Sequence, residues 1–560
     1  MLTAGIACLV YFIGLGTPAL WEPDEGRYAE IPREMVLSGD YVTPRNDWVR
    51  YFEKPPLVYW TSAAAMKLLG STQFAARSQA ALASVGSVVV MQILAEAIAG
   101  ESIGLLAAAA LGLSPLFFIF GRFASPDPLL AFFLTAALGA FYFAARGDFR
   151  TGASRKLMLL ASAMLALGTL AKGPVALVLG GGIALLWMVL DGRVRQVIAL
   201  RWPECIAIFA VIVVPWFVLA ASRNPGFLDF FFVHEHWQRY LENTEHGWGP
   251  WFFIPVVVVG MWPFFYFVPS GVQALWNTGS HESDRRRSDL RFLLIWFGLI
   301  FAFFSIPRSK LGEYILPGIP PIAILAAIGL QRISSAELTA AKRLLRWFAV
   351  ISAIPLVAVL IARIWFLPRL ALQGTSNALV MSIQGDSRSI ATDATLLAVC
   401  LALPTAFLLL ARLLKWRAVR MDRVCIAAAA LVAVVGAKVR IDMPGVSYRE
   451  LARAIGSRIQ SGCALVSYHH FVQSLPFYTG SREILAGFRG ELAPFADSPD
   501  AAPSFISTDE GLAHDWSAGA CVVVIANRSD LTHLETILTP KPVAIGCEGK
   551  KFALINRQVP

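Results

Sequence analysis

The sequence predicts a polytopic α-helical membrane protein that ends in a small α/β domain. Of its 560 residues, 56% are hydrophobic and 15% are charged, and the mean hydropathy is +0.60. Such values are typical of membrane proteins rather than soluble domains. Apolar stretches long enough to span a bilayer recur up to about residue 440, and beyond it strand and helix patterns alternate.

Thirteen stretches approach the length of about 20 apolar residues that a spanning helix needs. They lie near residues 4–20, 79–98, 103–121, 126–145, 157–171, 174–190, 203–221, 250–270, 291–306, 314–331, 347–367, 394–411 and 424–440. A further stretch, 57–70, is shorter and contains Lys67, and we interpret it as a juxtamembrane or re-entrant helix. Residues 4–20 lack the charged start and cleavage site of a signal peptide, so we expect an uncleaved first span.

The distribution of charge predicts the orientation in the membrane. The net charge is +10, and basic residues concentrate in the connections 146–156, 191–201, 332–346 and 412–423 and in the triplet Arg285-Arg286-Arg287. All of these basic segments lie on the same side of the membrane if the stretch 57–70 does not cross it. The positive-inside rule then places the N-terminus in the cytoplasm and the tail outside, and it explains the basic charge without nucleic acid as a partner.

The tail has the pattern of a small α/β domain, so we divide the chain into a membrane domain, 1–440, and a tail domain, 441–560. A helix is expected at 448–459 and another at 531–538, with strands at 464–468, 521–526, 543–546 and 551–555. No glycine-rich phosphate motif occurs, so the tail is assigned no chemistry. No CxxC pair occurs, so a cysteine metal site is not expected. If the tail faces an oxidising compartment, one disulfide can form among Cys463, Cys521 and Cys547.

The first long loop, 21–56, is the region richest in candidate functional residues. It carries eight carboxylates and five cations, a net charge of −3. Such crowding beside an apolar span indicates a chemical site at the membrane surface. A purely structural role is the weaker interpretation, because it leaves many titratable groups without a purpose.

In the predicted topology the unusual polar residues collect at the outer face. They are Asp24, Glu25, Arg27, Tyr28, Tyr51, Glu53, Lys54, Asp127, Lys172, His234, Glu235, His236, Arg239, Arg308, Lys310, Glu313 and Tyr314. Arginine, lysine and tyrosine near the lipid boundary suit a phosphate whose attached chain stays in the bilayer. The carboxylates offer a base, a charge stabiliser or a metal ligand. Lys172 either meets an anion or snorkels to the interface, and His234-Glu235-His236 is either a zinc motif or a surface histidine pair.

The order and spacing of several motifs resemble a known family. DEGRYAEIPREMVLSGDYVTP and YFEKPPLVYW resemble the first external loop of the ArnT-like aminoarabinose transferases. These are GT-C glycosyltransferases related to the protein O-mannosyltransferases. The similarity continues through RFASPD, LAKGP, FFFVHEHWQRYL and SKLGEYILP and covers roughly residues 1–440. One departure is Gly312-Glu313, which stands where the family more often has an uncharged, proline-containing pair.

The resemblance implies a GT-C fold of about 13 transmembrane helices with a periplasmic C-terminal α/β domain, in the bacterial inner membrane. It implies transfer of 4-amino-4-deoxy-L-arabinose from undecaprenyl phosphate to a lipid A phosphate, with no nucleotide cofactor. Carried over by residue, Asp24, Asp127, Lys54 and Lys172 would be catalytic, and Glu53 and His234 would bind a divalent metal, zinc in the family. The residues implied in substrate binding are Arg27, Tyr28, Tyr51, Arg239, Lys310 and Tyr314.

Two other functions stay open on the sequence alone. A related transferase could move another polyprenyl-phosphate sugar to a protein or glycan. A transporter or flippase is the second alternative, although transporters commonly show inverted repeats and polar residues within broken helices, and the sequence shows neither.

Overall fold

The structure is a computed structural model, and it describes residues 2–147, 151–193, 195–196, 202–238, 247–277, 283–335, 421–442 and 447–556. The chain forms two compact units. We call Met1–Ile13, Ala80–Val218 and Phe232–Asp442 the membrane unit, and Gly14–Gln79, Leu219–Phe231 and Met443–Pro560 the loop–tail unit. The sequence division at 440/441 had placed the first loop in the membrane domain, whereas in the structure it packs with the tail.

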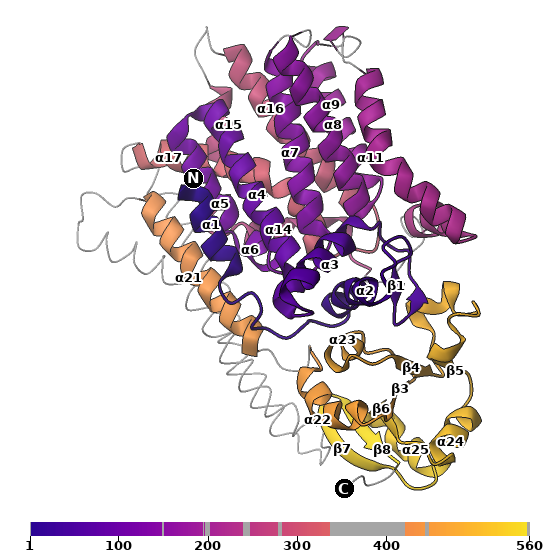
Figure 1. Ribbon diagram of the computed structural model, residues 1–560. Helices are drawn as coiled ribbons and strands as arrows, with labels where there is room; N and C mark the ends of the chain where they lie inside the picture. The colour runs from indigo at the N-terminus through magenta and orange to yellow at the C-terminus, as the bar shows by residue number, and fades with distance from the viewer. Residues whose placement is uncertain are drawn as a thin grey trace, which may run out of the picture. The chain divides into compact units, whose positions relative to one another are not determined.

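The membrane unit is built almost entirely of helices (Figure 1). Its elements are α1 (Leu2–Phe12), α4 (Gln73–Ala99), α5 (Glu101–Gly112), α6 (Pro115–Phe120), α7 (Asp127–Arg146), α8 (Gly152–Lys172), α9 (Val175–Leu190), α11 (Trp202–Arg223), η1 (Phe230–Gln238), η2 (Pro250–Phe252), α14 (Phe253–Gly260), η3 (Phe264–Phe267), α15 (Val268–Trp276), α16 (Ser283–Ser305), η4 (Gly312–Gly318), α17 (Ile319–Ser335) and α21 (Met421–Asp442). Helices α4 and α11 and the π-helix η1 begin or end in the loop–tail unit.

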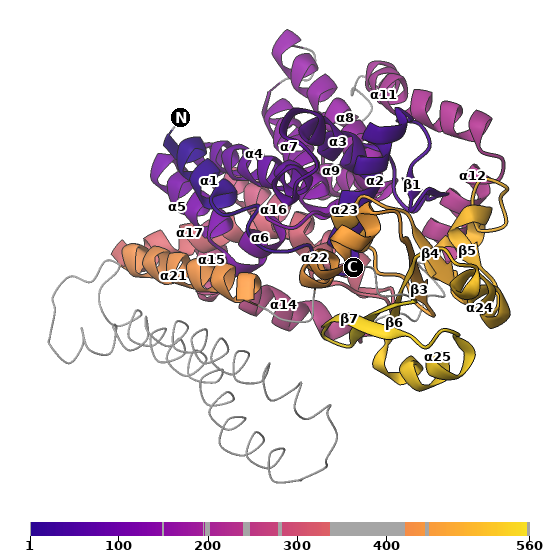
Figure 2. The same cartoon turned by 60° about the horizontal axis from the view of Figure 1, so that its bottom comes forward.

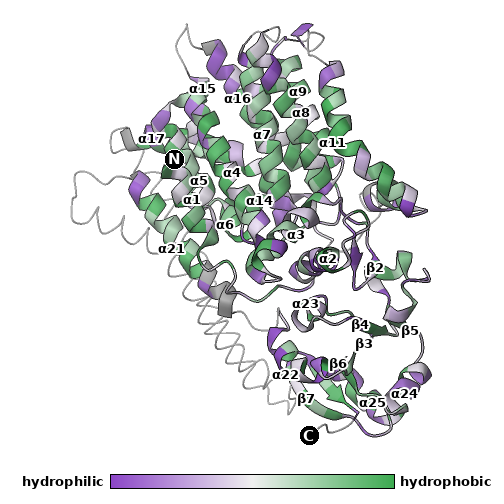
Figure 3. Ribbon diagram, viewed as in Figure 1, coloured by the Kyte–Doolittle hydropathy of each residue, from purple (hydrophilic) through white to green (hydrophobic). Residues whose placement is uncertain are grey.

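Within the described ranges, six helices are long and apolar enough to cross a membrane. They are Gln73–Ala99, Asp127–Arg146, Gly152–Lys172, Trp202–Arg223, Asp284–Ser305 and Gly312–Ile333. Hydrophobic residues cover most of α7, α8, α9 and α11 (Figure 3). The apolar window of α7 is 89% buried in protein and that of α11 only 17%, so α7 is central and α11 peripheral. The predicted crossings 347–367 and 394–411 lie outside the described residues.

Several predicted crossings are interrupted where glycine or proline occurs. The first, 4–20, is helical only to Phe12, because Gly14 adopts a φ of +68°. The third, 103–121, divides into α5 and α6 at Pro115, which lacks an N–H for the helix. The stretch 250–270 is bent by 98° between Pro250–Gly260 and Phe264–Trp276, a broken span or a re-entrant loop. At these three places the apolar stretch predicted as a crossing is therefore not one continuous helix.

Close helix contacts hold the membrane unit together. Helices α7, α8, α9 and α16 lie side by side in both views (Figures 1 and 2). Helix α17 packs closely against η3 and α15: a Cβ atom at Gly271 would lie 1.9 Å from the carbonyl oxygen of Leu325, and one at Gly329 would lie 1.9 Å from that of Phe267. Any larger residue at either position would force these segments apart.

The loop–tail unit combines the first loop with an α/β domain. Its loop elements are α2 (Asp24–Ser38), β1 (Arg45–Asn46), β2 (Val49–Arg50), α3 (Leu57–Leu69) and α12 (Phe227–Asp229). Its tail elements are α22 (Arg449–Gln460), β3 (Ala464–Tyr468), α23 (Leu475–Thr479), β4 (Glu483–Ala486), η6 (Gly490–Phe495), η7 (Ala502–Ser504), β5 (Phe505–Ile506), α24 (Asp509–Ser517), β6 (Val522–Asn527), η8 (Arg528–Asp530), α25 (Leu531–Ile537), β7 (Val543–Glu548) and β8 (Lys551–Ile555). The predicted short helix at 57–70 is present as the 13-residue α3.

The tail is a three-layer domain. Its sheet has the order β5-β4-β3-β6-β8-β7, in which β3 is parallel to β4 and β6, whereas β8 is antiparallel to β6 and β7. Leu451, Ile455 and Ile459 of α22 pack with one face, and Leu512 and Trp516 of α24 pack with the other. The prediction of an α/β domain after residue 440 is confirmed.

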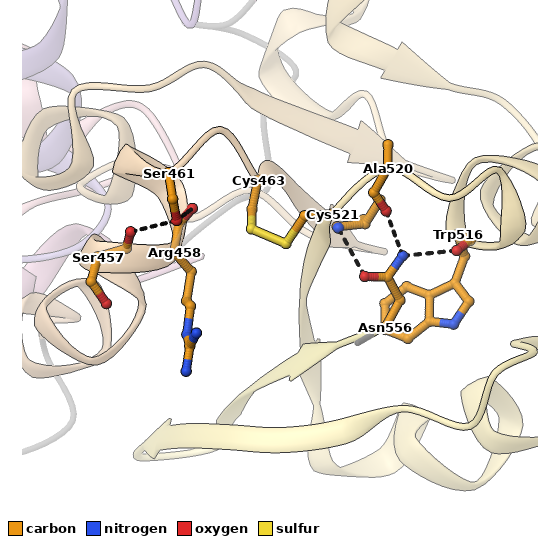
Figure 4. The surroundings of a disulfide bond; sticks show 9 residues. Ser457, Arg458, Ser461, Cys463, Trp516, Ala520, Cys521 and Asn556 are labelled. Carbon is orange, nitrogen blue, oxygen red and sulfur yellow. Dashed lines mark hydrogen bonds between the residues drawn. A yellow bond between two sulfur atoms is a disulfide. The ribbon is translucent and has the colours of Figure 1, made fainter. Parts of the chain in front are cut away.

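A disulfide joins two central strands of this sheet. Cys463 and Cys521 directly precede the parallel strands β3 and β6 and are bonded (Figure 4). Nearby, the Asn556 side chain accepts a hydrogen bond from the Val522 N–H and donates to the carbonyls of Trp516 and Ala520. Of the three tail cysteines, among which the sequence allowed one disulfide, Cys463 and Cys521 are the bonded pair, and Cys547 is free and exposed.

Candidate active-site residues in the two units

Arg27 is the centre of a polar cluster in the loop–tail unit. Asp24 and Arg27 lie three residues apart on α2 and therefore share a face of the helix. The guanidinium donates to the Asp24 and Glu491 carboxylates and to the Tyr51 hydroxyl at 2.7 Å. Arg27 is 8% exposed, and its Nε is buried without a hydrogen-bond partner. One donor of a buried cation is thus available for an anion.

Tyr28, Tyr51 and Glu53 lie near Arg27, and Lys54 lies near Glu53. The guanidinium carbon of Arg27 lies 5.6 Å from the ring centroid of Tyr28 and 5.7 Å from that of Tyr51. Glu53 Oε2 is 3.9 Å from Arg27 and 3.7 Å from the ammonium of Lys54. The structure therefore brings together all six first-loop residues that the resemblance implied.

The electrostatics of this cluster favour a permanently charged guanidinium. Burial alone would lower the pKa of Arg27, but neighbouring groups, Glu491 foremost, raise it well above its ordinary value. Burial raises the pKa of Tyr51, which therefore stays a hydroxyl donor. Arg27 therefore carries its positive charge in a site largely shielded from water.

Most other carboxylates of the first loop hold the loop in place. Glu25 forms a fully buried ion pair with Arg77, which also donates to the carbonyls of Leu15, Pro18 and Ala19. Arg33 pairs with Glu30, and Glu34 accepts from the Trp48 N–H.

Other loop residues bond to the tail. Glu22 accepts from the N–H groups of Gln473 and Ser474, and Asp47 accepts from that of Glu483. Arg45 and Arg50 pair with Asp500. The structural interpretation of the loop, which the sequence disfavoured, thus applies to most of its acids, while Asp24 and Glu53 belong to the Arg27 cluster.

A second group of predicted residues lies in the membrane unit. Asp127 begins α7 and Lys172 ends α8, and the two side chains form an ion pair. Each charge lies at the helix end where the helix dipole favours its sign. The Lys172 ammonium is also 4.2 Å from the ring centroid of Tyr314. Of the two alternatives for Lys172, the structure shows the anion partner.

Lys310 is satisfied by backbone oxygens. It is 1% exposed and donates to the carbonyls of Pro307 and, at 3.0 Å, Trp248. Burial lowers its pKa. It borders a cavity of about 490 Å³ that Trp248 and Arg308 also line.

The predicted metal ligands fall in different units. Glu53 is in the loop–tail unit, where its carboxylate faces two cations. His234 lies on η1 in the membrane unit, with Nδ1 3.4 Å from Glu235. Among the described residues, no group of three or more His, Cys, Asp or Glu side chains is arranged to hold a metal ion. The zinc site stays a prediction, and Arg239 lies outside the described residues.

Sequence reasoning missed one member of the Arg27 cluster. Glu491 comes from η6 of the tail, a region to which the sequence assigned no chemistry. Nothing local in the GELAPF stretch marks it as functional. Only the tertiary contact with Arg27 identifies it.

Comparisons with known proteins relate the chain to one group of transferases. The profile of the family described as dolichyl-phosphate-mannose-protein mannosyltransferase matches residues 3–231. Undecaprenyl phosphate-alpha-4-amino-4-deoxy-L-arabinose arabinosyl transferase 1 of Sodalis glossinidius is 37% identical over 57% of this chain and 56% of its own length. The corresponding transferase of Erwinia tasmaniensis is 33% identical over 63% of each chain. These sequence matches span less than two thirds of the relatives' lengths.

The similarity in structure extends further. The crystal structure of ArnT from Cupriavidus metallidurans bound to undecaprenyl phosphate matches with a TM-score of 0.85 and 27% identity, covering 99% of this chain and 97% of that one. Its apo state matches with a TM-score of 0.83. The predicted resemblance and the predicted fold class, a polytopic helical membrane protein with an α/β tail, are confirmed.

Proposed function

We propose that this chain, an ArnT-like membrane protein of the GT-C fold, transfers 4-amino-4-deoxy-L-arabinose from undecaprenyl phosphate to a phosphate of lipid A. One observation carries the proposal. The buried guanidinium of Arg27, with its unbonded Nε, offers an anion site in a chain whose fold matches ArnT over 97% of that protein's length.

The proposed reaction is a displacement at the anomeric carbon of the sugar. An oxygen of the acceptor phosphate forms a bond to that carbon, and the bond from the carbon to the donor's phosphate oxygen breaks, with inversion. Undecaprenyl phosphate leaves with one more negative charge than it had in the donor. The resemblance to ArnT assigns Arg27, Lys54 and Lys172 to receive that charge, and electrostatic stabilisation of this kind commonly contributes more to catalysis than any other effect.

The carboxylates have a different task in this reaction. A phosphate acceptor is already an anion and needs no general base. Asp24 therefore positions the acceptor or stabilises positive character on the sugar, and Asp127 holds the Lys172 ammonium. A protein hydroxyl acceptor would instead require one of them as a base.

We place the protein in the inner membrane with its N-terminus in the cytoplasm and its tail in the periplasm. The basic connections support this orientation, and so does the Cys463–Cys521 disulfide, because disulfides persist in oxidising compartments. We expect a membrane-impermeant thiol reagent to label Cys547 in intact spheroplasts. If Cys547 were labelled only after the spheroplasts are lysed, the tail would lie in the cytoplasm.

A divalent metal held by Glu53 and His234 remains a separate hypothesis. The metal would supply a further positive charge near the donor phosphate. No step above depends on it, and the metal content of the purified protein tests it.

The test of function is transfer by the purified protein from undecaprenyl-phosphate aminoarabinose to lipid A. We expect Lys54→Ala to lower the turnover by about 100- to 1,000-fold and Asp24→Asn to abolish it, while both variants stay folded. Asp40→Asn is the matched control, because Asp40 lies in the same loop but accepts hydrogen bonds from the Val42 and Thr43 N–H groups. Unchanged turnover in both test variants would remove the first loop from the mechanism.

A transferase with another lipid-linked sugar and a protein or glycan acceptor is the second candidate. The match of the mannosyltransferase profile to residues 3–231 favours it. The intact mass of lipid A from cells with and without the gene separates the two. An added aminopentose supports the first function, and unchanged lipid A supports the second.

A further inference from the structure

Three carboxylates from three separate segments face the guanidinium of Arg27. Asp24 comes from the same helix, Glu53 from the loop after β2, and Glu491 from η6 of the tail. Asp24 bonds to Nη2, whereas Glu491 bonds to Nη1, which also donates to Tyr51. The tail thus supplies one of the groups nearest to the candidate phosphate site.

The backbone that presents Glu491 is held firmly. The preceding Gly490 has a φ of +46°, a conformation that few other residues adopt, and the following Leu492 is fully buried. At the end of η6, Phe495 packs edge-on against Phe52 at 5.5 Å and Phe230 at 5.1 Å between ring centroids. The Glu491 side chain itself is 25% exposed and also accepts from the Tyr51 hydroxyl at 3.2 Å.

The charges of the cluster do not balance. Its carboxylates Asp24, Glu53 and Glu491 outnumber its cations, Arg27 and Lys54, by one. Burial raises the pKa of Glu491, and the charge of Arg27 opposes that rise. A phosphate that bonds to Arg27 adds more negative charge to a site of low dielectric, where like charges repel strongly.

A ligand that carries a cation next to its phosphate resolves this imbalance. An amino sugar phosphate has both groups. When its phosphate bonds to the guanidinium, a carboxylate that gives up its bond to Arg27 needs a new positive partner, because an unpaired carboxylate in a buried site is costly. Asp24 stays beside Arg27 on its own helix and Glu53 has Lys54, so Glu491 is the carboxylate that the ligand's ammonium would satisfy.

We propose that Glu491 is a specificity residue, which pairs with Arg27 in the empty site and with the ammonium group of the donor sugar in the loaded one. This inference rests on the proposed transfer reaction. It makes the tail domain part of donor recognition, and it assigns the preference for an amino sugar to a residue outside the first loop.

The test compares two donors in the purified full-length protein with lipid A as acceptor. One is undecaprenyl-phosphate aminoarabinose, and the other is the same donor with its amine acetylated and therefore uncharged. We expect Glu491→Gln to lower kcat/KM for the amino donor by about 10- to 100-fold, the range for a lost hydrogen bond to a charged group. The value for the acetylated donor should not fall, because this donor has no ammonium group to lose a partner and the variant also removes the competition of Glu491 for Arg27. Glu491→Asp, which keeps the charge, should retain part of the preference.

Matched controls separate this role from a structural one. Glu510→Gln removes an exposed carboxylate of the same domain and should change neither donor's kcat/KM. The thermal unfolding midpoint of each variant shows whether it is folded. An equal loss for both donors in folded Glu491→Gln, or a loss for neither, overturns the specificity role and leaves the transfer reaction standing. No transfer from the amino donor by the wild-type protein rejects the reaction and the specificity role together.

Discussion

The two units satisfy a buried cation in opposite ways. In the membrane unit, Lys172 has one carboxylate partner, Asp127, and each lies at the helix end that favours its charge. In the loop–tail unit, Arg27 has three carboxylates within 4 Å. Removing one member of a one-to-one pair leaves an uncompensated charge, whereas removing one carboxylate from the crowded cluster relieves repulsion. Breaking a matched pair is therefore expected to cost stability, whereas an unbalanced cluster is expected to exchange partners with a ligand.

The largest effect is expected where a one-to-one pair occurs in the loop–tail unit. Arg77 and Glu25 are fully buried, and Arg77 also binds three carbonyls. Arg77→Met should destabilise the protein by about 3–5 kcal/mol, because it leaves Glu25 buried and unpaired. The double variant Arg77→Met/Glu25→Leu should recover part of that loss. Thermal unfolding of the purified proteins measures both. If Arg77→Met were as stable as the wild type, one-to-one pairing would not explain how the buried cations contribute to stability.

The next effect concerns the pair in the membrane unit. Lys172→Ala should lower transfer by about 100-fold or more, because a cation assigned to the leaving phosphate is lost. It should also lower stability, since Asp127 is left without its partner. The double variant Asp127→Asn/Lys172→Met should regain stability but not transfer. Recovery of transfer in the double variant would limit the pair to a structural role.

A third prediction concerns a pH dependence of stability that arises from buried acids of the loop–tail unit. Burial raises the pKa of Glu22 from 4.5 to about 7 and that of Glu483 from 4.5 to about 8. Between the ordinary pKa of 4.5 and the raised values, the folded state binds more protons than the unfolded state. The free energy of unfolding should therefore fall as the pH rises from about 4.5 to about 8. Above that window both states are deprotonated and this dependence should end.

The unfolding midpoint across pH 5–9 checks this slope. Glu22→Gln and Glu483→Gln should each flatten it, because an amide does not titrate. The control Asp500→Asn should leave it unchanged, since hydrogen bonds from Arg50 and Arg45 outweigh burial and hold the pKa of Asp500 far below this range. A midpoint that rises between pH 5 and 8 would contradict the assignment of these two buried acids.

The local sequence patterns of the tail predicted its elements closely. The strand at 551–555 has the bounds of β8, and the helix predicted at 448–459 is α22, Arg449–Gln460. In the membrane unit, stretches of apolar residues predicted helices but not their interruptions. Helix α1 ends just before Gly14, and Pro115 starts a new helix inside a hydrophobic run. Hydropathy did not predict these interruptions, because it records burial in lipid and not backbone conformation.

The sequence by itself determined the class of protein and the α/β tail, because composition and periodicity are properties of the chain alone. The order of its motifs identified the first-loop residues of the Arg27 cluster by resemblance. The sequence did not determine which acids support the loop and which belong to the cluster. Only the tertiary structure distinguished Glu25, paired with Arg77, from Asp24, and only it brought Glu491 to Arg27 from more than 450 residues away. The reason is physical: the role of a charged group depends on its partners and its burial, and both are decided when distant segments pack together.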